Sequence, residues 1–195
     1  RSPHDAPIQQ YGKTSTLVAE PKVTRVFTTI DAGHLYQLSQ TAQSSILHTM
    51  VSLFGLYVQS ILDLDAVDVF VPVVEHYDIA SLNQIQSSSN ILPIRISRLA
   101  QGISEQIAQT RNQILQGMSH NVSIEQILSA TKTQRHLIPN ILVTQFMEST
   151  KYLALEQVNV QSLVIPPLHA DYDLTLAFQL KDQQQLQLEL TTGER

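Results

Sequence analysis

The chain has 195 residues, of which 43% are hydrophobic and 15% are charged, and this composition excludes a disordered polyelectrolyte and a collagen-like or proline-rich rod. Twelve Lys and Arg residues against seventeen Asp and Glu residues give a net charge of -5, so nothing favours binding to nucleic acid or to an anionic membrane. The absence of cysteine excludes disulfides, thiolate metal sites and a cysteine nucleophile. We therefore expect one globular domain, residues 1–195, that is stabilised by packing.

The first third of the chain predicts an arm, a strand and two helices. Residues 1–22 contain scattered prolines and show no sustained period, which is typical of a linker or arm. Residues 23–30 are rich in β-branched side chains and predict a strand. Asp31 to Gly33 then form a plausible entry to a first helix, whose apolar face continues with Leu35, Leu38 and Ala42. Residues 46–62 carry apolar side chains at spacings of three and four, so they predict a largely buried helix.

The same stretch, residues 46–62, is the longest apolar run, and it is too short and too polar to span a bilayer. No basic and apolar leader series opens the chain. These two observations favour a soluble protein, and we expect a cytoplasmic one.

The middle of the chain predicts two further strands. Residues 67–75 form a near-continuous run of β formers, as expected for a strand covered on both faces. Pro72 predicts that this strand lies at a sheet edge or ends there, because proline cannot donate to a ladder. Residues 81–90 are rich in Ser, Asn and Gln and predict a loop, and residues 91–97 alternate into another strand despite Pro93.

The last part of the chain predicts two helices and three strands. Spacings of four and seven mark one stripe of a long helix, made of Leu99, Ile103, Ile107, Ile114 and Met118. Ser123 and Gln126 form a capping-box pattern for a short helix, residues 124–130. Strands are predicted at residues 141–147, 173–180 and 185–190, the last two as a hairpin. The element order predicts an α/β fold, a two-layer sandwich with a mixed β-sheet.

Catalytic signatures are mostly missing from the sequence. There is no Walker A loop, GxGxxG, HExxH, GxSxG or EF-hand loop, and the seven histidines are too dispersed to predict a metal site. His169 and Asp173 have the HxxxD spacing by which acyltransferases orient a general base with an Asp. However, Leu174 follows where those enzymes have Gly. A loop histidine followed by an Asp at a strand start is therefore favoured over a base role for His169.

Six segments, taken in order, resemble known sequence patterns. VDVFVPVVE at 67–75 resembles "DivvGtPvagR", with His76 where Arg is usual. QSSSNILPIR at 86–95 resembles "GffvNtLPlR", keeping Asn90 and Arg95 while Gln86 replaces Gly. The others are residues 23–62, the segment SHNVSIEQIL at 119–128 ("HqdvPfeqlv"), Pro139 with Phe146 ("PlfqvlF"), and Asp173 to Leu176 ("fDLtL"). In this order the whole chain resembles the C-terminal half of a nonribosomal peptide synthetase condensation domain, which has a chloramphenicol acetyltransferase-like fold.

The resemblance implies a role in amide bond formation. In that family the active site lies between two lobes, where an acyl group on the phosphopantetheine arm of one carrier protein meets the amine on another. The catalytic HHxxxDG motif belongs to the N-terminal half, and nothing in this chain matches it. The resemblance therefore implies a lobe that has no catalytic residue, binds no cofactor directly and is inactive alone. It would supply one wall of the tunnel once it is joined to its N-terminal lobe.

The resemblance also implies roles for particular residues. Asn90 and Arg95 are expected to be scaffold of the tunnel-side strand, and Asp173 is placed in the same group. A segment near residues 148–168 is expected to cross to the other lobe. These positions imply contacts with the N-terminal lobe and with substrates that peptidyl or aryl carrier proteins deliver.

Two other functions stay open at this stage. Departures from the motifs at His76, Gln86, Asn121 and Ser123 are also expected of a degenerate module that docks carrier proteins without catalysis. His169 would fit a small acetyltransferase of the chloramphenicol acetyltransferase type, whose active site forms between the subunits of a trimer. In addition, the isolated lobe is expected to be able to form a homodimer through the apolar surface that its partner lobe would cover.

Overall fold

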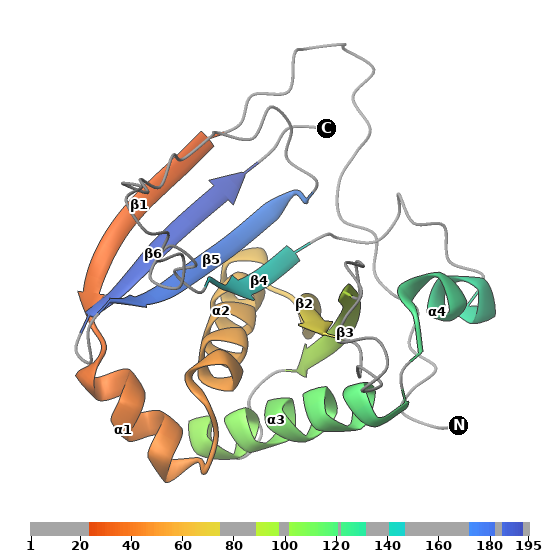
Figure 1. The fold of residues 1–195 in the computed structure, drawn as a ribbon, viewed down its shortest axis with the longest axis horizontal. Coiled ribbons are helices and arrows are strands. Elements are labelled where there is room, and N and C mark those ends of the chain that lie inside the picture. The colour runs from red at the N-terminus through yellow and green to blue at the C-terminus, as the bar shows by residue number, and fades with distance from the viewer. Residues whose placement is uncertain are drawn as a thin grey trace, which may run out of the picture.

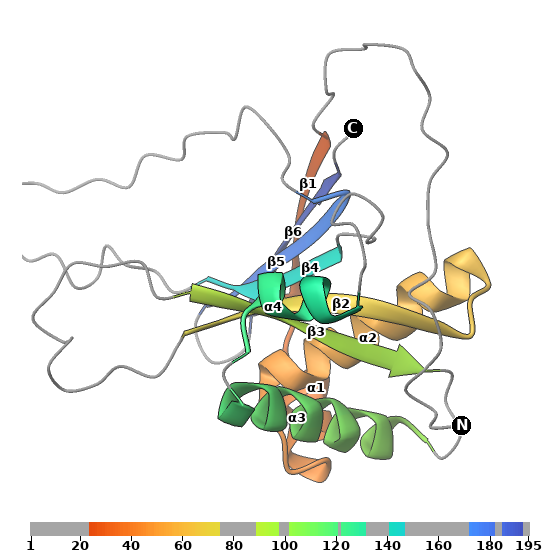
Figure 2. The ribbon, with the colours of Figure 1, turned by 90° about the vertical axis from the view of Figure 1, so that its right-hand side faces the viewer.

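The fold is an α/β sandwich with one mixed sheet, seen in a computed structural model that describes residues 24–74, 89–97, 102–120, 122–131, 141–146, 172–181 and 185–192. Within these ranges the elements in chain order are β1 (Thr24–Asp31), α1 (Gly33–Thr41), α2 (Ile46–Leu62), β2 (Ala66–Val74), β3 (Ser89–Ser97), α3 (Ile103–His120), α4 (Ile124–Thr131), β4 (Ile141–Gln145), β5 (Leu174–Lys181) and β6 (Gln185–Thr192). Helices α1, α2 and α3 lie together on one side of the sheet (Figures 1 and 2).

The six described strands are arranged in the order β1-β6-β5-β4-β2-β3. β1, β6 and β5 pair antiparallel, β5 pairs parallel with β4, β4 pairs parallel with β2, and β2 pairs antiparallel with β3. The predicted mixed sheet and the predicted hairpin of the last two strands are therefore confirmed. The strand order differs from the chain order, and β3 and β1 lie at opposite edges of the sheet (Figure 1).

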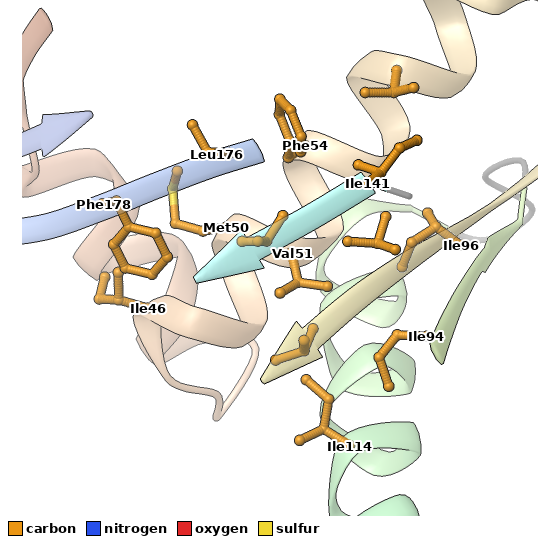
Figure 3. Packing of buried hydrophobic residues seen from close by; sticks show 14 of the residues in the cluster. Ile46, Met50, Val51, Phe54, Ile94, Ile96, Ile114, Ile141, Leu176 and Phe178 are labelled. Atoms are coloured by element: carbon orange, nitrogen blue, oxygen red, sulfur yellow. The ribbon is translucent and has the colours of Figure 1, made fainter. Parts of the chain in front are cut away.

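One apolar core joins the helices to the sheet. Met50 and Phe54 of α2 lie over β4 and β5, where they face Leu176 and Phe178 (Figure 3). On the other side of this core, Ile114 of α3 lies next to β2 and β3, and its side chain is 2% exposed. Alternate residues of each strand enter the core, as the period of two in a pleated strand requires. The sheet and three of the helices thus form two layers around a shared core.

The position of Pro72 corrects a prediction. β2 neither lies at an edge nor ends at Pro72: it runs on to Val74 between β4 and β3. Arg95 directs its backbone N–H and C=O to a side chain outside the sheet. The backbone groups of its ladder partner Asp68 therefore point toward β4. By the alternation of an antiparallel ladder, the backbone groups of Phe70 and Pro72 point the same way. β4 pairs with β2 at Phe70 only, so the missing N–H of Pro72 falls two residues beyond that pair.

The predicted helix patterns agree with the structure where it describes them. On α3, Ile107 and Ile114 of the predicted stripe are buried, whereas Leu99 lies outside the described residues. At the start of α4, the Ser123 Oγ accepts a hydrogen bond from the Gln126 N–H at 3.3 Å, and the Gln126 Oε1 accepts one from the Ser123 N–H at 3.1 Å. The predicted capping box is therefore confirmed.

A second capping box, at the start of α2, uses a histidine. The Ser45 Oγ accepts a hydrogen bond from the His48 N–H at 3.3 Å, and the His48 Nδ1 accepts one from the Ser45 N–H at 3.2 Å. Nδ1 can accept this bond only while it carries no proton. Burial, and secondly the positive charge of Arg111, lower the pKa of His48. The fold therefore favours the neutral imidazole that the cap requires.

We expect the replacement His48→Gln to remove a pH dependence of stability while it preserves the cap, because Gln at this position completes an ordinary capping box. A lowered pKa in the folded state means that the unfolded chain binds the proton more readily. The free energy of unfolding should therefore fall as the pH drops below about 6.5, the ordinary histidine pKa, by about 1 kcal/mol when the cap is lost. Urea unfolding at pH 5, 6, 7 and 8 measures this change.

The exposed His34 of α1 provides the matched control for this experiment. The variant His34→Gln should keep the pH dependence of the parent chain between pH 7 and 5, whereas His48→Gln should lose it. Equal losses of stability in the parent chain and in the His48→Gln variant over this range would contradict the role of His48.

Candidate functional site

Asn90 lies at the start of β3 and connects this strand to the junction between α3 and α4. Its side chain is 5% exposed. The Asn90 Nδ2 donates a hydrogen bond to the Val122 carbonyl at 2.9 Å, and the Asn90 Oδ1 accepts one from the Ile91 N–H at 2.8 Å. One buried carboxamide therefore holds two separate backbone segments together, which is a structural role.

Arg95 lies near the end of the same strand, where a glutamine from α3 binds its backbone. The Gln113 Oε1 accepts a hydrogen bond from the Arg95 N–H, and the Gln113 Nε2 donates one to the Arg95 carbonyl, both at 3.0 Å. The Arg95 side chain is 40% exposed, and its Nε lies 4.0 Å from the Asp68 Oδ1 of β2. Asp68 is only 15% exposed. Burial raises the pKa of Asp68, and the nearby positive charge of Arg95 partly opposes this effect.

A double-mutant cycle is expected to separate these two effects. Arg95→Gln should lower the free energy of unfolding at pH 7 by about 0.5–1 kcal/mol, because it leaves the largely buried Asp68 carboxylate without its cation. Since the raised pKa means that the folded state disfavours the charged carboxylate, Asp68 costs more stability as the pH rises through its pKa. In an Asp68→Asn background that cost is absent, so Arg95→Gln should have no effect on the free energy of unfolding there.

Denaturant unfolding of the four proteins at pH 7 provides the measurement. An equal loss of stability from Arg95→Gln in both backgrounds would mean that the Arg95 charge does not act on Asp68. The loss of stability would then come from the lost packing of the arginine stem.

An open groove of about 370 Å³ lies between β3, α3 and the start of α4. Its lining residues are Leu92, Pro93, Ile94, Gln113, Gln116, Gly117, His120, Val122 and Ile127. Gly117 lets α3 approach β3 closely, because a Cβ at this position would lie 2.8 Å from the Leu92 Cδ1. The groove follows the outer edge of β3, between Asn90 and Arg95, so both predicted scaffold residues lie at its borders.

The chemistry of this groove is that of a binding surface. Among the lining residues that the structure describes, His120 is the only titratable group, and its Nδ1 lies 2.7 Å from the Gln116 carbonyl. The described part of the lining contains no carboxylate, hydroxyl or amine that could act as a nucleophile or as a partner in acid–base chemistry. The groove could accept an apolar group beside two carboxamides.

The other predicted site residues do not join Asn90 and Arg95. Asp173 is half-buried and immediately precedes β5, which is the place that a strand-start aspartate occupies. β5 is separated from β3 by β4 and β2, a distance of about 14 Å at the usual strand spacing. His169 lies outside the described residues, as do His76, Gln86 and Asn121. The roles predicted for His169 and Asp173 therefore stay predictions.

Gln113 is the site residue that sequence reasoning missed. The sequence contains many glutamines dispersed among apolar residues, and nothing in the local pattern distinguishes the one that binds the β3 edge. The sequence indicates Gln113 only through two features of α3 taken together, its apolar stripe and Gly117, which orient α3 over β3. That combination can be interpreted only when the position of β3 in the sheet is known.

Within the described ranges, no group of three or more His, Cys, Asp or Glu side chains is arranged to hold a metal ion. No single described helix is long and apolar enough to cross a membrane, although α1 and α2, which are bent by 99° at their junction, reach that length and apolarity together.

Comparisons with known proteins define the fold. No protein-family model matches the chain, and no curated protein matches it in sequence. Among solved structures, it is similar to a holo four-domain nonribosomal peptide synthetase bound to AMP and glycine (TM-score 0.72, 15% identity, 88% of this chain and 15% of that chain). It is also similar to the condensation domain of the Monacolin K polyketide synthase MokA (TM-score 0.70, 10% identity, 98% and 49%). A third is VibH, a nonribosomal peptide synthetase condensation enzyme (TM-score 0.64, 17% identity, 89% and 42%).

These similarities establish the architecture of the chain. It has the fold of one lobe of a condensation domain, with a chloramphenicol acetyltransferase-like mixed sheet. The chain spans half or less of the length of each of these solved chains.

Proposed function

We propose that this chain is the C-terminal lobe of a condensation domain that forms an amide bond between two substrates tethered to carrier proteins. Joined to its N-terminal lobe, it supplies one wall of the tunnel through which the two phosphopantetheine arms enter. The amine of the acceptor attacks the donor thioester, so a C–N bond forms, a C–S bond breaks, and the donor arm leaves as a thiol. This lobe contributes shape and support, and the proton-handling histidine belongs to the other lobe.

The observation that carries this proposal is the match of nearly the whole chain to about half of a condensation domain, 98% against 49% for MokA. The ordered partial motifs, with Asn90 and Arg95 retained on β3, favour the C-terminal half. The groove described above is consistent with a supporting role, because its described lining is mostly apolar and holds no catalytic pair. The carrier proteins and the tethered substrates follow from the family likeness and are part of the proposal.

Reconstitution tests the proposed function. The chain is mixed, or fused, with the lobe encoded immediately upstream of it, and two carrier proteins loaded with an acyl group and an amine are added. Amide product, detected by mass spectrometry of the acceptor carrier, should form only when both lobes are present. Alanine replacement of the second histidine of the upstream HHxxxDG motif should abolish product while the two lobes still bind each other.

The alternative function is a degenerate module that docks carrier proteins without catalysis, which the motif departures at His76, Gln86, Asn121 and Ser123 favour. Binding of a loaded carrier protein in a titration, with no product even when the upstream lobe is present and folded, would overturn the catalytic proposal in favour of this one. Acetyl transfer from acetyl-CoA by the chain alone, lost in His169→Ala, would overturn both.

A further inference from the structure

The strand β3 lies at one edge of the sheet, and three of its outward backbone N–H positions are bound or missing within the chain itself. Arg95 directs its N–H and C=O away from β2, toward Gln113, and the alternation of an antiparallel ladder gives Ile91 and Pro93 the same orientation. The Ile91 N–H is bound by the Asn90 Oδ1 at 2.8 Å, and Pro93 has no N–H. These three positions therefore have no free N–H to donate to a further strand.

The Gln113 side chain forms the bonds that one residue of a neighbouring strand would form. In an antiparallel sheet, two residues of a hydrogen-bonded pair exchange both of their N–H···O bonds. The Gln113 Oε1 accepts a hydrogen bond from the Arg95 N–H, and the Gln113 Nε2 donates one to the Arg95 carbonyl, both at 3.0 Å. One carboxamide of a helix therefore takes the place of a strand residue beside Arg95.

Three links hold α3 along β3 in one register, and α3 lies beside β3 in both views of the fold (Figures 1 and 2). From the end of β3 to its start, the linked pairs are Arg95 with Gln113, Leu92 with Gly117, and Asn90 with Val122. Because the residue numbers fall along β3 as they rise along α3, the helix runs antiparallel to the strand. The packing of the helix therefore holds the Gln113 carboxamide at the Arg95 backbone.

We propose that Gln113 closes the β3 edge to strand addition, so that the groove beside β3 accepts an apolar group but excludes an extended peptide. A peptide that adds to a sheet edge gains its affinity from main-chain hydrogen bonds. At Ile91, Pro93 and Arg95 the donors for those bonds are already used or missing. The same closure prevents two copies of the chain from pairing at this edge. This inference does not depend on the proposed condensation function.

Hydrogen exchange at the Arg95 amide tests the closure directly. In Gln113→Ala this amide should exchange about 2- to 12-fold faster than in the parent chain, the factor that corresponds to the loss of one hydrogen bond. NMR spectroscopy of the full chain labelled with ¹⁵N measures this rate. Gln116→Ala is the matched control, because Gln116 lines the same groove and is exposed on the same helix. It should leave the exchange rate of the Arg95 amide unchanged.

Opening two adjacent outward positions tests the consequence of the closure. In the double variant Pro93→Val/Gln113→Ala, position 93 gains an N–H and the Arg95 N–H loses its acceptor. This variant should associate more strongly than the parent chain in sedimentation velocity. Its Arg95 amide should exchange more slowly as the protein concentration rises, because the strand of a second copy covers it. The single variant Pro93→Val, which keeps Gln113, should sediment like the parent chain.

Four outcomes would overturn the proposal. Equal exchange of the Arg95 amide in Gln113→Ala and in the parent chain would show that Gln113 does not close the edge. Faster exchange throughout α3 in Gln113→Ala would mean that Gln113 anchors the helix instead. A double variant that sediments like the parent chain would show that the opened edge does not accept a strand. Association without slower exchange at Arg95 would place the contact at another surface.

Discussion

Replacing Phe178 with alanine is expected to lower the free energy of unfolding by about 3–5 kcal/mol. Phe178 is 1% exposed on β5, an inner strand of the sheet, and its ring lies beside Ile46 and Met50 of α2 (Figure 3). Removing the ring leaves a cavity where the sheet and α2 meet, and neither layer can move into it without breaking ladder hydrogen bonds or helix contacts. Urea unfolding followed by far-UV circular dichroism measures the change.

Phe146, which follows β4 and is 50% exposed, provides the control for this prediction. Phe146→Ala should change the free energy of unfolding by no more than about 0.5 kcal/mol, the usual range for a surface substitution. If the two alanine variants were destabilised equally, the core would not lie between α2 and β5. A refolded Phe178→Ala protein that binds a small apolar molecule such as benzene would confirm the cavity directly.

Replacing Gly55 with alanine is expected to lower the free energy of unfolding by about 1–3 kcal/mol. In an exposed helix this change would be favourable by about 1 kcal/mol. Here a Cβ would lie 2.5 Å from the Ile96 Cγ1 and 3.0 Å from the Ile96 Cβ of β3. These atoms are close to the β3 backbone and cannot rotate away, so α2 would have to move off the sheet.

A matched glycine and a second-site variant test the cause of this loss. Gly117→Ala on α3 should cost less stability, because its Cβ would meet the flexible end of Leu92, with the nearest atom at 2.8 Å. In an Ile96→Ala background, the cost of Gly55→Ala should be much smaller, since the colliding Cγ1 and Cγ2 are gone and only the Cβ contact at 3.0 Å is left. Destabilisation by Gly55→Ala that persists unchanged in the Ile96→Ala background would contradict steric exclusion as its origin. Thermal unfolding of the four combinations gives the answer.

Patterns that are local in sequence predicted most of the described elements. The apolar stripe of α3 and the Ser123–Gln126 capping box depend only on residues within a few turns, and both are present in the structure. The prediction for Pro72 was wrong because the place of a strand in its sheet depends on partners far along the chain. β4, the partner on one side of β2, begins about seventy residues later, at Ile141.

The candidate site was predictable only in part, for the same reason. Asn90 and Arg95 follow from the resemblance of residues 86–95, and the structure gives each a definite contact. The contact partners, the Val122 carbonyl and the Gln113 carboxamide, lie 32 and 18 residues away from Asn90 and Arg95 respectively. No local pattern specifies these contacts, because they exist only after α3 has packed on β3.

Three outward backbone positions of β3 are closed within the chain, because the Asn90 Oδ1 binds the Ile91 N–H, Pro93 has no N–H, and Gln113 binds both backbone groups of Arg95. This arrangement has a consequence during synthesis. Asn90 and Pro93 belong to the strand itself, so the Ile91 and Pro93 positions are closed as soon as the strand has been synthesised. Gln113, which binds the backbone groups of Arg95, comes 18 residues after Arg95. A ribosome that adds about 5–20 residues per second therefore delivers it about 1–4 s later. Until α3 emerges and folds, the Arg95 end of the nascent strand is open to neighbouring chains on the same messenger RNA. The translation speed between codons 95 and 113 is therefore expected to influence how much of this protein is recovered soluble.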